Sequence, residues 1–210
     1  MHIVSRTQPT MSSPPNQPEV WLRGPVSGVP ATLQPVAHAL LQALEDAERL
    51  TANLQKEEVW TSPGGAATIG FHLRHMAGSL DRLLCYARGE LLNEAQRSAL
   101  AAETNRTTET SADDLLRILR ATIDSALDQL RASSEETLDD TRHVGRAGYP
   151  STVRGLLYHA GEHTSRHAGQ ISTTVRILQG LRASGRLTGT ERQYARSIRS
   201  PQLKTTEEEP

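Results

Sequence analysis

The sequence is poor in cysteine, in net charge, in long apolar runs and in aromatic residues, and each shortage argues against a particular structure or function. The single cysteine, Cys85, excludes an internal disulfide and fits a reducing cytosol, so we expect a cytoplasmic protein. A net charge of -1 leaves no basic excess to neutralise a phosphate backbone, which argues against nucleic-acid binding. No apolar run approaches the roughly 20 residues that a membrane helix needs, so we expect no membrane association.

The two ends of the chain differ in composition from its middle. Residues 1–18 are polar and rich in proline, with no hydrophobic stretch for a secretory signal, which predicts a disordered leader. Translation could start at Met1 or at Met11. Residues 186–210 are polar and end in three glutamates and a proline, which predicts a flexible tail. Residues 19–185 are left as one domain of ordinary size.

The scarcity of aromatic residues, at 3%, means that a core has to be built from Leu, Ala, Val and Ile, which favours helices over sheets. Apolar residues recur at spacings of three and four in four segments. Ser111 with Asp114 predicts the start of the third helix, while Ser151 and Gly180 predict the start and end of the fourth. The predicted long helices cover about residues 33–55, 67–88, 112–131 and 151–178, with a short helix at 94–103 and a polar connection at 132–150.

Four amphipathic helices joined partly by long connections predict an all-α fold, a four-helix bundle with disordered termini. A helical hairpin repeat array is the weaker alternative, because no repeat period is visible in the sequence.

Histidine is concentrated on the second and fourth predicted helices. Five of the eight histidines lie within residues 71–75 and 158–167. His163 and His167 are four residues apart, so they share one helix face, beside the apolar stripe and toward the interior. Burying two neutral imidazoles without partners is costly, and a metal ion would satisfy both. Hydrogen bonds to backbone or solvent are the plainer interpretation, which we rank second for an inward-facing pair with further histidines nearby.

On the second helix the pattern does not choose between two histidines. His72 is the more central in the apolar stripe, whereas His75 lies beside Gly78, where a small residue leaves room for a ligand or a neighbouring helix. His159 extends the fourth-helix pair to a series at i, i+4 and i+8, and it could support a ligand or line the entrance to the site.

Two motifs resemble those of the DinB-like superfamily of four-helix metalloproteins: Gly70-Phe71-His72-Leu73-Arg74-His75-Met76-Ala77 on the second helix, and His159-x3-His163-x3-His167-Ala168-Gly169-Gln170 on the fourth. The resemblance covers about residues 20–181, and the fourth-helix motif is its most specific part. It implies that His75, His163 and His167 are the metal ligands and that His159 is not one. The residue before the last histidine, often histidine in relatives, is Arg166 here, which leaves the ligands intact but changes the rim.

The resemblance implies an activity similar to that of thiol-dependent S-transferases and isomerases, or of members classed as hydrolases. Three neutral nitrogens leave a coordination position open on the metal, which could bind water or a thiolate. Zinc and nickel are the favoured metals, and ferrous iron and manganese also accept this donor set. We therefore expect a divalent-metal-dependent enzyme that activates a low-molecular-weight thiol or water and acts on a small-molecule substrate, with a thiol as one candidate.

The sequence also allows functions other than a metal-dependent enzyme. The main alternative hypothesis is a non-catalytic protein that binds a metal or a small molecule. A third hypothesis is a metal-free interaction module. Bundles of this type often pair, so a homodimer is one expectation.

No general base is convincing, because Glu162 faces away from His163, and the catalytic residues are unknown. Arg74, Arg82 and Arg166 could guide an anionic substrate but are more typical of solvated surface charges, and Gln170 could support a ligand or simply pack.

Overall fold

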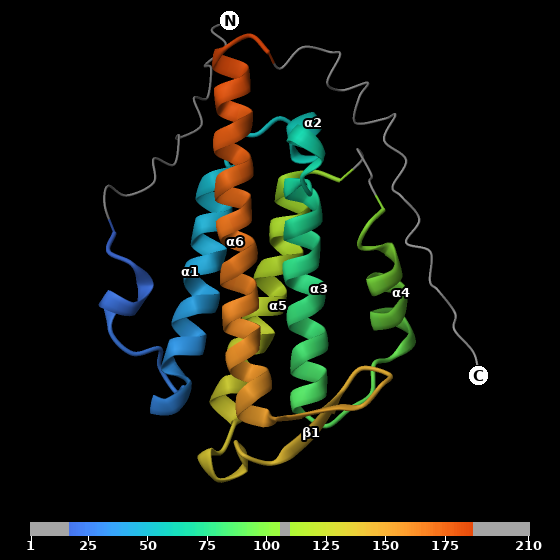
Figure 1. Cartoon of the computed structure of the whole chain (residues 1–210). Helices are drawn as coiled ribbons and strands as arrows, with labels where there is room; N and C mark the ends of the chain where they lie inside the picture. The colour runs from blue at the N-terminus through green and yellow to red at the C-terminus, as the bar shows by residue number, and fades with distance from the viewer. Residues whose placement is uncertain (1–16, 106–109, 187–210) are drawn as a thin grey trace, which may run out of the picture.

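Four long helices lie alongside one another and form the body of the protein (Figure 1). The computed structural model describes residues 17–105 and 110–186, so most of the predicted leader and tail lies outside the described residues. Helix α6 packs against α1 and α3, and α5 packs against the same two helices. The predicted helical fold class is confirmed, with a small two-stranded sheet added. The long helices are α1 (Gln34–Thr51), α3 (Ile69–Ala87), α5 (Ala112–Ala132) and α6 (Val153–Ala183).

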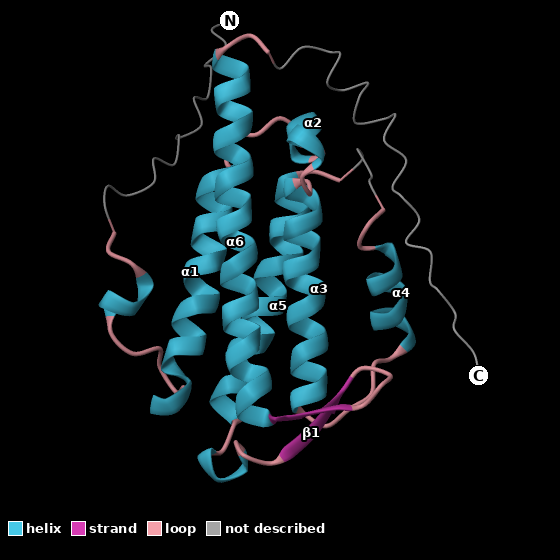
Figure 2. Cartoon of the chain, in the orientation of Figure 1, coloured by secondary structure: helices cyan, strands magenta, loops and turns pink. Residues whose placement is uncertain are grey.

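Shorter elements surround this body (Figure 2). Helix α4 lies alongside α3, outside the four long helices (Figure 1). Strands β1 and β2 pair as an antiparallel hairpin at one end of the body, where Arg142 donates a hydrogen bond from Nε to the carbonyl of Ala87 at 2.9 Å and so covers the end of α3. The short elements are η1 (Val20–Arg23), η2 (Ala31–Leu33), α2 (Lys56–Val59), η3 (Pro63–Gly65), α4 (Glu94–Ala102), η4 (Glu135–Thr137), β1 (Thr141–Val144) and β2 (Tyr149–Thr152).

Capping side chains explain where three of the long helices, α3, α5 and α6, begin. Ser111 caps α5 as predicted, with Asp114 completing the reciprocal capping box. The cap of α6 is Thr152, whose hydroxyl accepts from the backbone N–H of Gly155, so the prediction of Ser151 was wrong by one residue. Ser151 instead belongs to β2, which the polar appearance of residues 132–150 had hidden.

The predicted helix ends were less accurate than the starts. Helix α6 continues through Gly180 to Ala183, and the left-handed conformation that ends helices is adopted by Gly185, with φ of 66°. Glycine inside a helix costs only about 1 kcal/mol relative to alanine, so Gly180 alone does not stop it. The first predicted helix, at about residues 33–55, ends early, because α1 stops at Thr51, and the separate short helix α2 begins only at Lys56, beyond the predicted range.

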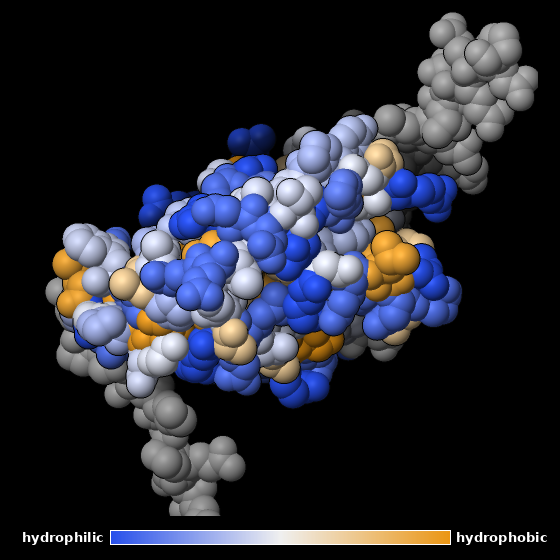
Figure 3. Space-filling view, turned by 90° about the horizontal axis from the view of Figure 1, so that it is seen from below, coloured by the Kyte–Doolittle hydropathy of each residue, from blue (hydrophilic) through white to orange (hydrophobic). Residues whose placement is uncertain are grey.

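The core is aliphatic, as the composition predicted. Its largest fully buried side chains come from all four long helices and their flanks, and they include Leu40, Leu73, Met76, Leu119, Ile123, Leu157 and Ile171. Seen from below, the surface is mostly hydrophilic, with apolar residues in separate small groups (Figure 3). Among the described residues, no helix has the length and hydropathy of a membrane span.

Candidate metal centre

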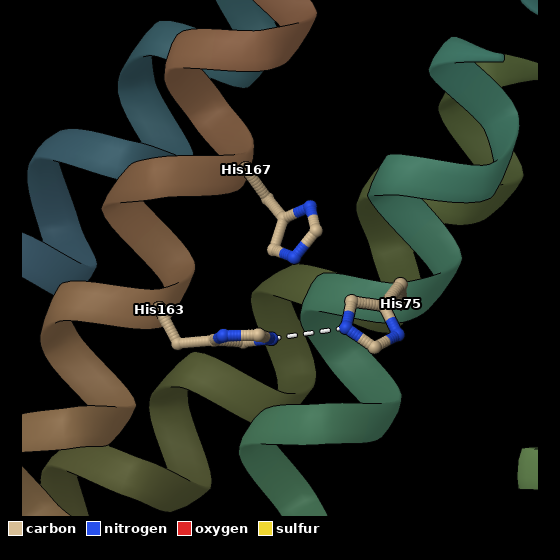
Figure 4. A group of neighbouring side chains, drawn as sticks. All are labelled: His75, His163 and His167. Atoms are coloured by element: carbon tan, nitrogen blue, oxygen red, sulfur yellow. Dashed lines mark hydrogen bonds between the residues drawn. The ribbon is translucent and has the colours of Figure 1, made fainter. Parts of the chain in front are cut away.

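Three histidines from two helices converge inside the body of the protein. His75 comes from α3, and His163 and His167 come from α6, with one ring nitrogen of each lying within 4.8 Å of the others. The Nε2 atoms of His75 and His163 are 2.9 Å apart, and the ring of His167 points toward the space between them (Figure 4). All three side chains are half-buried, so the group, which we call the histidine cluster, is partly shielded from water.

The packing of α6 against α1 and α3 determines where the histidine cluster lies. Residues 163 and 167 are one turn apart and face α3, while Gly161 on the opposite side of α6 faces α1. A Cβ at Gly161 would lie 3.4 Å from the backbone of Val36, so the absence of a side chain lets α6 pack closely against α1. On α3 the ring of His75 is stacked on Phe71, with an angle of 11° between the two planes.

A buried carboxylate supports His75 from behind. Glu103, the residue after α4, has an exposed fraction of 5%, and its Oε2 lies 2.7 Å from His75 Nδ1. Its other oxygen, Oε1, accepts from Arg82 Nη1 at 2.5 Å. Burial alone would raise the pKa of the Glu103 carboxyl, but the hydrogen bonds from His75 and Arg82 outweigh burial and lower that pKa. The carboxylate is therefore ionised at neutral pH.

Glu103 determines which nitrogen of His75 carries the proton. An ionised carboxylate can only accept hydrogen bonds, so Nδ1 of His75 must be the donor. In a neutral imidazole the other nitrogen then holds a free lone pair, and in His75 that nitrogen is Nε2, which faces the cluster. The arrangement of a carboxylate behind a histidine is typical of metal ligands, in which it fixes the tautomer and the ring orientation.

His72 lies behind His167 as Glu103 lies behind His75. The Nδ1 atoms of the two rings are 3.0 Å apart, and His72 is buried, with an exposed fraction of 5%. If Nε2 of His167 has a lone pair, Nδ1 of the same ring carries the proton. This N–H then donates a hydrogen bond to Nδ1 of His72. The two histidines between which the sequence pattern could not choose thus both lie at the site, His75 in the cluster and His72 behind another member of it.

Burial keeps the imidazoles of His72, His163 and His167 neutral. It is the main cause that lowers the pKa of His72 to about 4, with the neighbouring His75 adding to the effect. Burial and then the surrounding histidines likewise lower the pKa of His167 to about 4, and the pKa of His163 is lowered for the same reasons. Neutral imidazoles are the form that binds metal ions, and the lowered pKa values keep His163 and His167 in this form at neutral pH.

The donor set and its spacing fit a divalent cation. Metal–nitrogen bonds of about 2.1 Å in a tetrahedral site separate the ligand nitrogens by roughly 3.4 Å. That separation lies between the 2.9 Å contact of His75 with His163 and the 4.8 Å limit for the whole cluster. One buried atom, Nδ1 of His163, has no hydrogen-bond partner in the described part of the chain, so this ring is held from behind by neither Glu103 nor His72.

The remaining candidates from the sequence have other roles. Arg82 is buried against Glu103, so its interpretation as a solvated surface charge was wrong. Arg74 donates to the carbonyls of Ala102 and Asn105, and its guanidinium lies 5.1 Å from the ring centre of Trp60.

On α6 the other candidates lie at the surface. Arg166 forms an ion pair with Glu162, and both side chains are exposed. Gln170 is exposed, and His159 is exposed with its ring 5.3 Å from that of His163. The side chains that contact the cluster from behind are therefore Glu103, which sequence analysis missed, and His72.

Comparison with known proteins agrees with this architecture. A sequence model described as the DinB superfamily matches residues 21–171. No curated protein sequence matches the chain.

Solved structures are similar in fold over most of their length. A conserved protein from Enterococcus faecalis is 21% identical with a TM-score of 0.55, covering 69% of this chain and 95% of its own. A DinB-like protein from Bacillus cereus is 17% identical with a TM-score of 0.51, covering 67% and 91%. A protein from Streptococcus pneumoniae is 15% identical with a TM-score of 0.52, covering 71% and 90%.

Proposed function

This chain belongs to the DinB superfamily, and on that premise we propose that it binds a divalent metal ion through His75, His163 and His167 and uses it to activate a low-molecular-weight thiol or water. The observation that carries the proposal is the convergence of three imidazoles within 4.8 Å in a partly buried site. The lowered pKa values of His163 and His167 support it, because both rings are neutral at physiological pH.

The protein's contribution is to hold the three donors in fixed orientations. Glu103 fixes the tautomer of His75. When His72 accepts a hydrogen bond from Nδ1 of His167, the two rings of the cluster, His75 and His167, both have a lone pair on Nε2 for the cation. A bound cation would supply Lewis acidity at an open coordination position and lower the pKa of a nucleophile placed there. Zinc and nickel suit three imidazole donors best, and iron or manganese could also bind.

The surroundings of the cluster favour a thiol over water as the nucleophile. Two carboxylates lie near the histidines, Glu103 beside His75 and Glu162 beside His159, and each is ion-paired with an arginine, so neither is well placed to accept a proton. A thiol, with an ordinary pKa of about 8.5, needs only a modest shift to ionise at neutral pH without a base. Water, with a pKa near 15.7, needs a far larger one. We therefore infer an S-transferase type of reaction, ahead of hydrolysis.

Metal binding is tested first, with untagged protein. Elemental analysis and calorimetric titration with Zn²⁺ should show one ion per chain, and His163→Ala should weaken binding by more than about 100-fold because it removes one of three ligands. His143→Ala, which removes an exposed histidine from β1, is the matched control and should bind as the wild type does. A wild type that binds no more Zn²⁺ than His163→Ala does would refute the site.

Catalysis is tested separately. The metal-loaded protein is incubated with several small thiols and a panel of electrophiles, and the rate is compared with that of the free metal ion and of His163→Ala. A rate above both supports the thiol-dependent reaction. No acceleration with any thiol, in a protein that holds the metal, would favour the rival function of a non-catalytic metal-binding protein.

A further inference from the structure

Helix α4 is attached to the body by polar contacts. It contains no buried residue, and its main packing partner is α3. Three side chains of α3 hold it and the residue that follows: Asp81 accepts from Gln96 at 2.8 Å, Arg74 donates to the carbonyl of Ala102 at 3.1 Å, and Arg82 pairs with Glu103. Elements with few buried apolar contacts open at low free-energy cost, so the docking of α4 depends on these contacts.

The strongest of these contacts lies against the histidine cluster. Glu103 is the most buried residue of this segment, and it bonds to Arg82 and to His75 at the same time. Gly78 makes room for it, because a Cβ at that position would lie 2.5 Å from Glu103 Oε1 and 2.9 Å from Arg82 Nη1. Helix α3 is thus shaped to receive the carboxylate beside a prospective metal ligand.

From this arrangement we propose that Glu103 is a positioning residue for the metal centre and couples metal binding to the docking of α4. The proposal rests on the proposed function, because it concerns the same three-histidine site. Glu103 touches neither the cation nor a substrate, and it acts through His75.

The coupling follows from the two nitrogens of one ring. A cation that takes the Nε2 lone pair of His75 requires the proton to be on Nδ1, where Glu103 accepts it. The cation also withdraws electron density from the ring, which makes the N–H a stronger donor. Metal binding therefore tightens the contact that holds Glu103 in place. By thermodynamic linkage, a docked α4 strengthens metal binding to the same extent.

Two variants separate this role from a general loss of structure. Glu103→Ala removes the acceptor, whereas Gly78→Ala keeps every functional group and only displaces the carboxylate. Alanine is a better helix former than glycine, so Gly78→Ala should leave α3 folded. Gly180→Ala is the matched control, since it makes the same exchange inside α6 at a position with nothing within 4 Å.

The first readout is Zn²⁺ affinity, measured by titration against a competing chelator. We expect Glu103→Ala to weaken binding by about 10- to 100-fold, Gly78→Ala to weaken it by a smaller factor, and Gly180→Ala to leave it unchanged. The second readout is amide hydrogen exchange. Zn²⁺ should slow exchange in α4 of the wild type, and this response should be lost in Glu103→Ala. The amides of α5, which contributes no ligand, are the internal reference.

Each outcome decides a different point. If the wild type binds Zn²⁺ and Glu103→Ala binds it equally well, the positioning role is overturned while the metal site stands. If exchange in α4 does not respond to Zn²⁺ bound by the wild type, the coupling is overturned. If the wild type binds no Zn²⁺, the proposed function fails, and this inference fails with it.

Discussion

The metal-free protein should lose stability when the pH falls from 7 to 5, and His72 supplies a defined part of that loss. Its pKa is about 4 in the folded protein, mainly because of burial, and 6.5 in the unfolded chain. Between these values the unfolded chain binds a proton that the folded protein does not. The free energy of unfolding is therefore highest above pH 6.5 and decreases as the pH falls toward 4.

The size of the effect follows from the two pKa values. Each unit of pH inside this window costs about 1.4 kcal/mol, so His72 should account for about 2 kcal/mol between pH 7 and pH 5. His167 contributes in the same direction, since its pKa is also about 4. The two contributions are not additive, because each histidine lies in the electrostatic field of others in the group.

Urea unfolding in the presence of a chelator, followed by the circular dichroism of the helices, measures this loss directly. His72→Gln should flatten the pH dependence, because glutamine does not titrate, while the exposed His143→Gln should keep the slope of the wild type. An unfolding free energy that is constant between pH 7 and pH 5 in the wild type would show that the imidazoles are not buried as neutral groups.

Three further predictions concern the site and the helices that carry it. Metal occupancy should fall as the pH drops toward about 4, because protons then compete with the cation for His167, and occupancy that stays full down to about pH 3 would exclude histidine ligation. Gly70→Ala should lower the unfolding free energy by about 1–3 kcal/mol in chemical denaturation, since its Cβ would lie 2.7 Å from ring carbons of the buried Trp60; an unchanged value would mean that the indole can move aside. Thr68→Ala should cost about 1 kcal/mol because it removes the hydroxyl that accepts from Phe71 N–H at the start of α3, whereas Thr68→Ser should retain most of that stability.

The long helices could be predicted because their signals are local. Apolar residues at spacings of three and four mark the buried faces of α1, α3, α5 and α6, and the capping box at Ser111 marks the start of α5. The hairpin of β1 and β2 escaped prediction because each strand has only four residues, too few for an alternating pattern to stand out from a polar connection.

The site could be predicted in part, for a similar reason. The spacing of His163 and His167 places them on one face, but the choice between His72 and His75 depends on how α3 is rotated against α6, which no local pattern encodes. Glu103 was missed because α4, the helix that precedes it, has no buried residue and so no apolar stripe to orient it. Its position depends on Arg82 and Gly78, which lie 21 and 25 residues away in the sequence.

The cluster draws its members from helices that are distant in the chain, since His75 and His163 are 88 residues apart. A cation bound there would act as a reversible cross-link between the two halves of the protein and would bind the native state alone. At a free concentration 100 times its dissociation constant, such a ligand adds about 2.7 kcal/mol to the unfolding free energy. Thermal melting would then serve as a metal titration, and the order in which different ions raise the midpoint would rank their affinities without any knowledge of the substrate.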